Sequence, residues 1–196
     1  MKKISFLILA ITILLFFASC APIDNLIDDK ADRKDQIIKS KESNLVLTFP
    51  GTWTKEELNT KASIEMTYME KQQYMIVLEE AAVVVYTIDD YTSVMMNNTL
   101  ALVDINDAYE MSEMTDITIG KDTAAKQFEL SGTADKVKTK YFGVCAEVND
   151  RFYFFLSRSL QSTYDEAKPV FIKILNSANF DGISPPTTSD EETTAE

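Results

Sequence analysis

Hydrophobic residues between positions 44 and 180 alternate with polar ones over most of that length, which is typical of β-strands with one buried face. Turn-forming residues interrupt the pattern, with Pro50-Gly51 ending the first segment and Asn149-Asp150 separating the last two. The pattern predicts strands over residues 45–49, 62–69, 74–79, 115–119, 124–131, 137–148 and 151–159.

Two segments have the 3.6-residue period of an amphipathic helix instead. The first, residues 88–107, follows Thr87, and a carboxylate three residues after this threonine completes a capping box. The second, residues 163–178, has a clean apolar stripe, and Thr163 with Glu166 is predicted to cap it in the same way.

The last two predicted strands have apolar side chains on both faces. In residues 137–148, Phe142 and Val144 share one face while Tyr141 and Cys145 share the other. Strands of this kind lie at the centre of a sheet with a layer on each side. The sequence therefore predicts an α+β domain with an antiparallel β-sheet of about six to seven strands sandwiched between helices.

The order of these elements, with the short motifs between them, resembles the PsbP-like superfamily. Its motifs are Phe49-Pro50-Gly51-Thr52-Trp53, Leu78-Glu79-Glu80, Thr87-Ile88-Asp89-Asp90-Tyr91 and Ser177-Ala178-Asn179-Phe180. Members include the extrinsic photosystem protein, a Ran-binding nuclear transport factor and many bacterial lipoproteins. The resemblance covers residues 45–180 and implies an α/β/α sandwich that serves as a binding or accessory module, without a shared catalytic set.

The N-terminal residues have the layout of an export signal. Lys2 and Lys3 precede an apolar run over residues 4–17, which is shorter than the roughly 17 to 25 residues of a spanning helix. The motif Phe17-Ala18-Ser19-Cys20 resembles the lipobox of bacterial lipoproteins, where the cysteine is acylated, typically with palmitate, and becomes the mature N-terminus. We expect a signal peptide over residues 1–19 and a lipid anchor on Cys20. The alternative is a chance cysteine beside an ordinary cleavage site.

The segments on either side of the domain lack periodic apolar residues. Residues 20–43 hold the lipidated cysteine and a charged tether, and residues 181–196 form an acidic tail containing Pro185-Pro186. We expect the tether to hold the domain, residues 44–180, clear of the bilayer, and the tail to be disordered. The predicted location is the cell membrane or outer membrane, facing outside the cytoplasm.

Composition narrows the possible functions. The chain has 19 Lys and Arg against 31 Asp and Glu, a net charge of −12, which argues against nucleic acid and anionic headgroups as partners. It has no histidine, so it cannot build a His-dependent triad or most catalytic zinc sites. Cys145 lies in mid-strand among apolar residues and is predicted to be an inert buried thiol. We therefore expect a domain that is not an enzyme and needs no cofactor or metal.

Several polar residues and one aromatic residue are candidates for a binding surface, because they lie at predicted turns, strand ends or a helix face. They are Trp53, Glu79, Glu80, Asn98, Lys136, Lys138 and Lys140. The three lysines either meet an acidic partner or protect a strand end from aggregation. Glu79 and Glu80, together with residues 89–90, form either a calcium-attracting cluster or a solvated acidic rim. Asn98 is either a ligand contact or a boundary residue.

Together these features predict a lipid-anchored cell-envelope protein that presents a non-catalytic binding or accessory domain, with an envelope or extracellular protein as its partner. Two alternatives remain open. A small-solute binding protein would have an apolar pocket of about 300 Å³ or more between sheet and helix. A carboxylate-dependent hydrolase of envelope glycans would have a deep cleft with two converging acids.

Overall fold

The computed structural model describes residues 33–82 and 86–182. The predicted signal peptide, Cys20, most of the tether and nearly all of the acidic tail lie outside the described residues. Within the described ranges, no helix is long and apolar enough to span a membrane.

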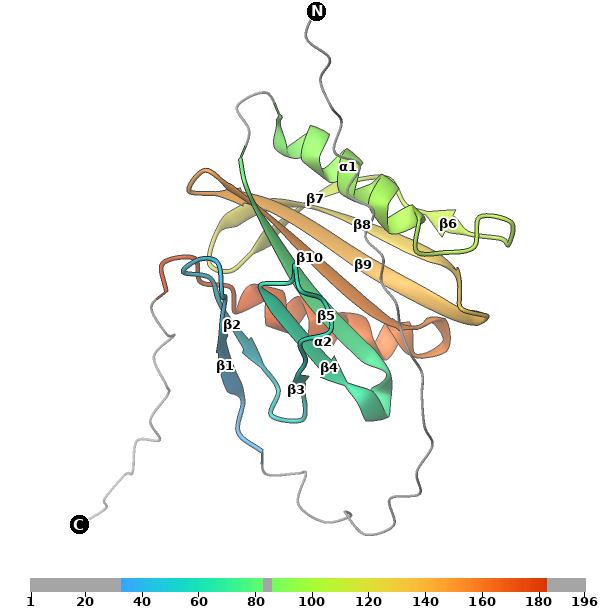
Figure 1. Cartoon of the computed structure of the whole chain (residues 1–196), viewed down its shortest axis with the longest axis horizontal. Coiled ribbons are helices and arrows are strands. Elements are labelled where there is room, and N and C mark those ends of the chain that lie inside the picture. Colours follow the sequence, from blue (N-terminus) through green and yellow to red (C-terminus); the bar gives the residue numbers. More distant parts are fainter. Residues whose placement is uncertain (1–32, 83–85, 183–196) are drawn as a thin grey trace, which may run out of the picture.

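An eight-stranded antiparallel sheet lies at the centre of the domain, in the order β3-β4-β5-β10-β9-β8-β6, and β7 also pairs with β8 (Figure 1). The strands are β3 (Thr54–Lys55), β4 (Ile64–Tyr68), β5 (Gln73–Ala81), β6 (Glu110–Met111), β7 (Thr115–Ile119), β8 (Thr123–Ala134), β9 (Val137–Val148) and β10 (Arg151–Leu160). The α+β class is confirmed. The two-residue strands β3 and β6 were not predicted, because they are too short for alternation to show.

Two-residue turns set the register of the long strands. Asn149 and Asp150, between β9 and β10, both have positive φ angles of 53° and 58°. Asp135 and Lys136, between β8 and β9, also have positive φ angles, of 50° and 68°. Such turns match the twist of the strands, and Asn and Asp tolerate the left-handed region. The second turn is shorter than predicted, since β8 continues to Ala134 through residues expected to form a loop.

Both faces of the sheet are covered. The helix α1 (Ile88–Leu100) packs mainly on β8, β9 and β10 from one side. The helix α2 (Tyr164–Asn176) and a two-stranded ribbon, β1 (Gln36–Lys39) with β2 (Val46–Phe49), cover the other side (Figure 1). A separate buried cluster fills each interface. The prediction that β9 and β10 are buried on both faces is confirmed.

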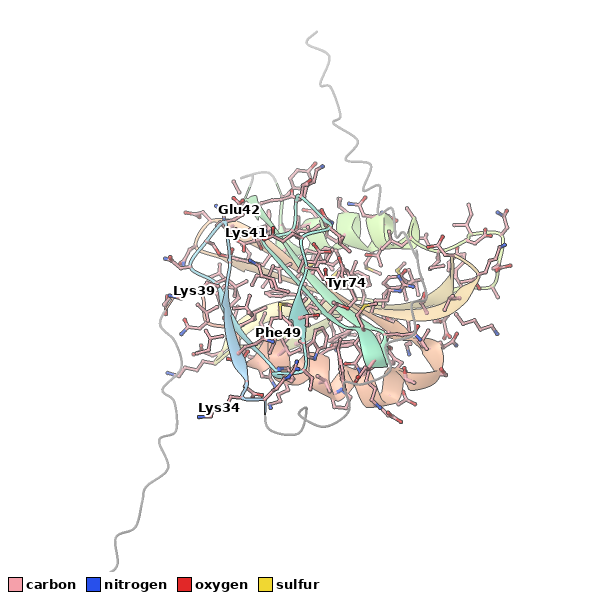
Figure 2. The ribbon with its side chains drawn as sticks, turned by 60° about the horizontal axis from the view of Figure 1, so that its bottom comes forward. Lys34, Lys39, Lys41, Glu42, Phe49 and Tyr74 are labelled. Carbon is pink, nitrogen blue, oxygen red and sulfur yellow. The ribbon has the colours of Figure 1, made fainter. Side chains whose placement is uncertain are left out.

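The expected tether boundary at residue 43 is wrong, because β1 belongs to the folded domain. Its four residues pair with β2, and the Gln36 side chain donates a hydrogen bond to the Trp53 carbonyl at 2.5 Å. Figure 2 shows Lys39 at the end of β1, with Lys34 before the strand and Lys41 after it. The strand is short and flanked by charges, so its sequence resembles that of a solvated linker.

The helix α1 begins as predicted and ends earlier. Thr87 and Asp90 form the expected capping box, in which the Asp90 N–H donates to Thr87 Oγ1 at 3.2 Å and the Thr87 N–H to Asp90 Oδ2 at 3.0 Å. The predicted extension to residue 107 is wrong. Asp104 accepts a hydrogen bond from the Asn106 N–H at 3.0 Å and donates its own N–H to the Thr133 carbonyl at 2.7 Å, which turns the chain toward β8.

The predicted capping box of α2 is also wrong. A 3₁₀ turn, η2 (Gln161–Thr163), leads directly into the helix, so Thr163 has φ −115° and ψ 9° and its side chain caps nothing. A capping side chain needs the extended backbone that this turn does not allow. The predicted apolar stripe is confirmed, since Ala167, Phe171 and Ile174 are buried, even though Pro169 lies inside the helix.

Candidate binding site

The helix α1 packs on β8, β9 and β10 and leaves β4 and β5 largely uncovered on that face of the sheet (Figure 1). A groove lies on this uncovered part. Its cavity has a volume of about 290 Å³. We call it the β4–β5 groove, and its main lining residues are Glu56, Leu58, Met69, Tyr74, Arg158 and Leu160. The pairing of β5 with β10 ends at Tyr74 and Arg158, whereas β10 continues beside β9 to Leu160. This step in the sheet forms the hollow.

A row of side chains crosses the sheet on the face of the groove, and three of them, Thr67, Tyr74 and Arg158, form the floor of its cavity. Thr67 on β4 is paired with Tyr74 on β5, Tyr74 with Arg158 on β10, and Arg158 with Tyr141 on β9. Paired residues in an antiparallel sheet point to the same side, so these four side chains stand next to one another. The guanidinium carbon of Arg158 lies 6.0 Å from the centre of the Tyr141 ring.

Glu65 organises the groove from below. It is only 3% exposed, and both carboxylate oxygens are engaged: Oε1 accepts from the Tyr74 hydroxyl at 2.5 Å and Oε2 from the Asn59 N–H at 2.9 Å. Burial, together with the bond to Glu65, raises the pKa of Tyr74, so the hydroxyl stays protonated. Glu65 thereby fixes the tyrosine ring and holds residues 56–61, which carry Leu58, against the sheet.

The rim of the groove is apolar and open to solvent. Leu58 is 72% exposed and Met69 is 68% exposed, and they lie on the two segments that border the cavity. Isolated exposed apolar residues are common, but a pair that flanks a cavity is typical of a binding site. The groove therefore joins apolar walls to a polar floor.

Arg158 is the feature that gives the floor its charge. It is half-buried, and no carboxylate in the described part of the chain lies within salt-bridge distance of it. By contrast, Lys126 contacts two aspartates, and Lys140 and Lys168 both contact Glu129. An unpaired, half-buried guanidinium in a chain of net charge −12 is a ready anion-binding group.

No protein-family model and no curated protein sequence matches this chain. Solved structures do match it. Cyanobacterial PsbP (CyanoP) from Synechocystis sp. PCC 6803 superposes with a TM-score of 0.59 at 12% identity, over 84% of this chain and 98% of that one. The fold is PsbP-like. At this identity the likeness shows the fold alone.

Two further structures share this PsbP-like fold. LpqN, involved in cell envelope biogenesis of Mycobacterium tuberculosis, has a TM-score of 0.50 at 10% identity, over 78% of this chain and 91% of that one. The Ran-binding protein Mog1p of Saccharomyces cerevisiae has a TM-score of 0.52 at 7% identity, over 76% and 96% of the two chains. These matches confirm the sandwich architecture that the sequence motifs implied.

The structure contradicts the expected place of Trp53 on a binding surface. Its side chain is 2% exposed and lies in the core of the PsbP-like domain, with its ring centre 5.5 Å from that of Phe49 and 6.3 Å from that of Phe171. The turn at Pro50 sends the chain inward, and the Trp53 N–H donates to the Pro50 carbonyl at 3.0 Å.

The three candidate lysines do not form one free basic surface. Lys136 lies in the turn before β9, and Lys138 is exposed. Lys140 is occupied, because its ammonium lies 2.7 Å from Glu129 and 4.4 Å from the centre of the Tyr164 ring. Glu129 also contacts Lys168 at 2.6 Å, so this cluster joins α2 to the sheet.

The candidate acidic residues are likewise separated. Glu79 faces the α2 side, where its side chain is fully buried, whereas Glu80 is exposed and paired with Phe152 of the α1 side. Asp89 lies 3.0 Å from Lys126, and Asp90 serves the helix cap. Among the described residues, no group of three or more such ligands is placed to hold a metal ion.

Two other residues that the sequence singled out lie outside the groove lining. Asn98 is half-buried, and its side-chain nitrogen lies 3.9 Å from the Met95 sulfur on the same helix. Cys145 is buried as predicted, and burial raises the pKa of its thiol to about 12. The thiol is therefore protonated at neutral pH and is a poor nucleophile.

The residues that line the groove were not selected from the sequence. Two signals were present: Arg158 is a charge that interrupts the apolar strand β10, and Glu65 is a carboxylate inside the apolar strand β4. Charged residues within core strands are uncommon unless they are paired or functional. Leu58 and Met69 carry no such signal, because loop residues of this kind occur widely.

Proposed function

We propose that this chain is a lipid-anchored cell-envelope protein whose PsbP-like domain binds a small ligand in the β4–β5 groove and does not transform it. The observation that carries this proposal is the combination of an exposed apolar rim at Leu58 and Met69 with the guanidinium of Arg158 on the floor, which has no carboxylate partner among the described residues. The cavity volume of about 290 Å³ is close to the lower end of typical ligand pockets, roughly 300 Å³.

The groove favours a small solute over the protein partner expected from the sequence. The expected contact surface for that partner was the sheet edge or the Trp53 loop, with the three lysines as contributors. Trp53 is buried and Lys140 is engaged by Glu129. The small-solute alternative was expected between sheet and helix, and the groove lies on the uncovered half of the sheet instead. LpqN, which shares the fold, is involved in cell envelope biogenesis, and this supports an envelope role at the level of fold only.

Glu65 is the reason to favour binding over hydrolysis. A glycosidase needs one carboxyl group to donate a proton and another to act as base or nucleophile. Both oxygens of Glu65 already accept hydrogen bonds, and the acid that lines the cavity, Glu56, belongs to the opposite side of the groove from β10. This arrangement suits a structural carboxylate that supports a binding floor.

The anchor is tested on the full chain expressed in a bacterium that processes lipoproteins. We expect the protein to partition into detergent and to carry acyl groups on Cys20, detected by mass spectrometry of its N-terminal peptide. Two or three acyl chains bind a bilayer stably at ~0.8 kcal/mol per buried CH₂. Cys20→Ser should abolish both properties. A wild-type protein that is found unacylated would contradict the anchor.

The groove is tested by incubating the protein with a small-molecule and lipid extract of bacterial envelopes and identifying the retained compounds by mass spectrometry. The double variant Leu58→Asp, Met69→Asp should retain at least tenfold less of the ligand than the wild type. The matched control is Val94→Asp, Ile105→Asp, which places the same charges on exposed apolar residues outside the groove lining. Equal retention by wild type and groove variant, or release of a cleaved product, would overturn the proposal.

A further inference from the structure

Arg158 and the apolar rim restrict the chemistry of a ligand for the β4–β5 groove. We propose that the groove binds a medium-chain aliphatic carboxylate, with the carboxylate on Arg158 and the alkyl chain against Leu58, Met69 and Leu160. This inference rests on the proposed function, of which it names the ligand class. Charge, shape and the pairing of the surrounding backbone each support this ligand class.

The charge of the ligand follows from Arg158. Its guanidinium is held between Tyr74 and Tyr141 by the strand register, with no partner carboxylate in the described residues. Both tyrosine hydroxyls stay protonated, since burial raises the pKa of each. A planar guanidinium presents parallel N–H groups that match the two oxygens of a carboxylate. The floor therefore selects an anion.

Glu56 lies on the opposite side of the groove from Arg158, and the Tyr74 hydroxyl between them is influenced by both charges. Its backbone N–H pairs with the Glu65 carbonyl beside β4, so Glu56 stands on the β3 side, while Arg158 stands on β10. With β4 and β5 between them, three strand spacings of about 4.8 Å separate the two backbones by roughly 14 Å. An anion beside Arg158 lies at the β10 side of the groove, whereas a long ligand with a second negative charge would place that charge near Glu56.

The apolar walls of the groove determine the kind of chain that the ligand carries. Leu58, Met69 and Leu160 border a cavity of about 290 Å³, which has room for one short alkyl chain. Burial of apolar surface contributes about 25 cal/mol per Å² before the costs of association. For a ligand of about ten heavy atoms we therefore expect a Kd between about 0.1 and 1 mM.

The backbone around the groove argues against an extended peptide as the occupant. The β4–β5 hairpin is paired internally, Thr54 and Thr67 donate hydroxyls to the carbonyls of Thr67 and Gln73, and the Gln72 N–H donates to the Met69 carbonyl. Beyond Arg158, only Ser159 and Leu160 of β10 lack a β5 partner, which is too short an edge for an extended peptide. A bound peptide strand depends on free N–H and C=O groups at a sheet edge. A ligand with one charge and an alkyl chain needs none.

The test is a titration of the wild-type protein with octanoate and with octylammonium, followed by two-dimensional NMR. We expect octanoate to shift the signals of Tyr74 and Arg158 and to bind at least tenfold more tightly than octylammonium. Arg158→Met keeps the aliphatic bulk and removes the charge, so it should weaken octanoate at least tenfold. It should not weaken octylammonium, because it removes a charge that repels this cation. Lys138→Met removes a positive charge from an exposed site and is the matched control, which should bind octanoate as the wild type does.

Three outcomes would overturn the inference: equal binding of the two probes, octanoate binding that Arg158→Met does not change, or tighter binding of a leucine-terminated peptide with a free carboxylate than of octanoate. If Arg158→Met does not fold, the wild type still tests the inference, because it should bind octanoate at least tenfold more tightly than octylammonium. Loss of envelope ligand in the Leu58→Asp, Met69→Asp variant, together with no octanoate binding, would remove this inference and leave the proposed function standing. If the Leu58→Asp, Met69→Asp variant retains as much envelope ligand as the wild type, both the proposed function and this inference are overturned.

Discussion

Glu79 is a carboxylate with a fully buried side chain, and Ser40 is the residue that satisfies it. Its Oε1 accepts a hydrogen bond from Ser40 Oγ at 2.5 Å, while Oε2 has no hydrogen bond and lies 3.7 Å from Arg151 Nε. Ser40 Oγ also accepts from the N–H groups of Glu42 and Ser43 at 2.9 and 3.1 Å. A buried charge that loses its hydrogen-bond donor is strongly destabilising. The Ser40 hydroxyl therefore links the end of β1 to the central sheet.

We predict that Ser40→Ala lowers the free energy of unfolding by about 1 to 3 kcal/mol, because it leaves Glu79 with Arg151 alone. Urea unfolding followed by circular dichroism measures the change. Ser162→Ala, at an exposed serine, is the control and should stay within about 0.5 kcal/mol of the wild type. A loss for Ser40→Ala no larger than that of the control would contradict the role of this bond.

Glu129 gives the stability of the domain a dependence on pH. Burial raises the pKa of Glu129, but the ammonium groups of Lys140 and Lys168 outweigh this and hold it below its usual value. A carboxyl with a lowered pKa stabilises the fold above the unfolded-state pKa, about 4.3, and loses this contribution as the pH falls through the folded-state value. The interaction of Glu129 with Lys140 and Lys168 therefore stabilises the domain at neutral pH, and this contribution is lost in acid.

We predict that Glu129→Gln lowers the free energy of unfolding by about 1 kcal/mol at pH 7. The difference from the wild type should shrink toward zero as the pH falls below about 4, because the wild-type carboxyl is then protonated as well. A series of urea titrations at different pH values measures both. Glu113→Gln, at an exposed acid, should show no such trend. A difference that stays constant with pH would refute the assignment.

At the scale of elements, β10 joins the two layers of the domain. Phe152, Phe154 and Leu156 enter the cluster under α1, while Tyr153 and Phe155 enter the cluster under α2. Phe154 is 1% exposed, and its ring stacks 6.2 Å from that of Phe128. The strand is therefore covered on both sides, and a cavity in either layer weakens its contact with that layer.

We predict that Phe154→Ala costs about 3 to 5 kcal/mol, as a large-to-small change in a closed core does. Urea unfolding at neutral pH measures this, with Tyr109→Ala at a residue that is 47% exposed as the control. A cost below about 1 kcal/mol would place Phe154 outside the core and would contradict the two-sided burial of β10.

The elements that could be predicted from the sequence carry their signal locally. The long strands alternate, Asn149-Asp150 supplies a turn, and Thr87 with Asp90 supplies a cap, each within a few residues. Where tertiary contacts decide, prediction failed: the tie from Asp104 to Thr133 ends α1, and the 3₁₀ turn removes the cap from Thr163. Gly143 is a further example of a tertiary contact that the sequence does not show. A Cβ at this position would lie 2.3 Å from the Phe128 ring, so only glycine fits under it in the packed sheet.

At the scale of the whole molecule, the groove could not be predicted because distant segments build it. Leu58, Met69 and Arg158 come together only after β5 pairs with β10 and Glu65 holds the loop of Asn59. Trp53 was misplaced for the same reason, since its neighbour Phe171 lies on the last helix. Arg158 and Glu65, two charged residues inside apolar strands, were the local signs of the site.

The domain boundary supplies the last prediction. If the folded unit began at residue 44, removal of residues 1–43 would leave stability unchanged. β1, however, pairs with β2, Gln36 bonds the Trp53 carbonyl, and Ser40 bonds Glu79. We predict that the chain lacking residues 1–33 unfolds near the midpoint of the full chain, whereas the chain lacking residues 1–43 unfolds roughly 5 to 10 °C lower, since each kcal/mol shifts a domain of this size by about 2 to 4 °C. Scanning calorimetry of the two truncated proteins makes the comparison. Equal unfolding midpoints for the two truncated proteins would show that β1 does not stabilise the folded domain and belongs with the tether.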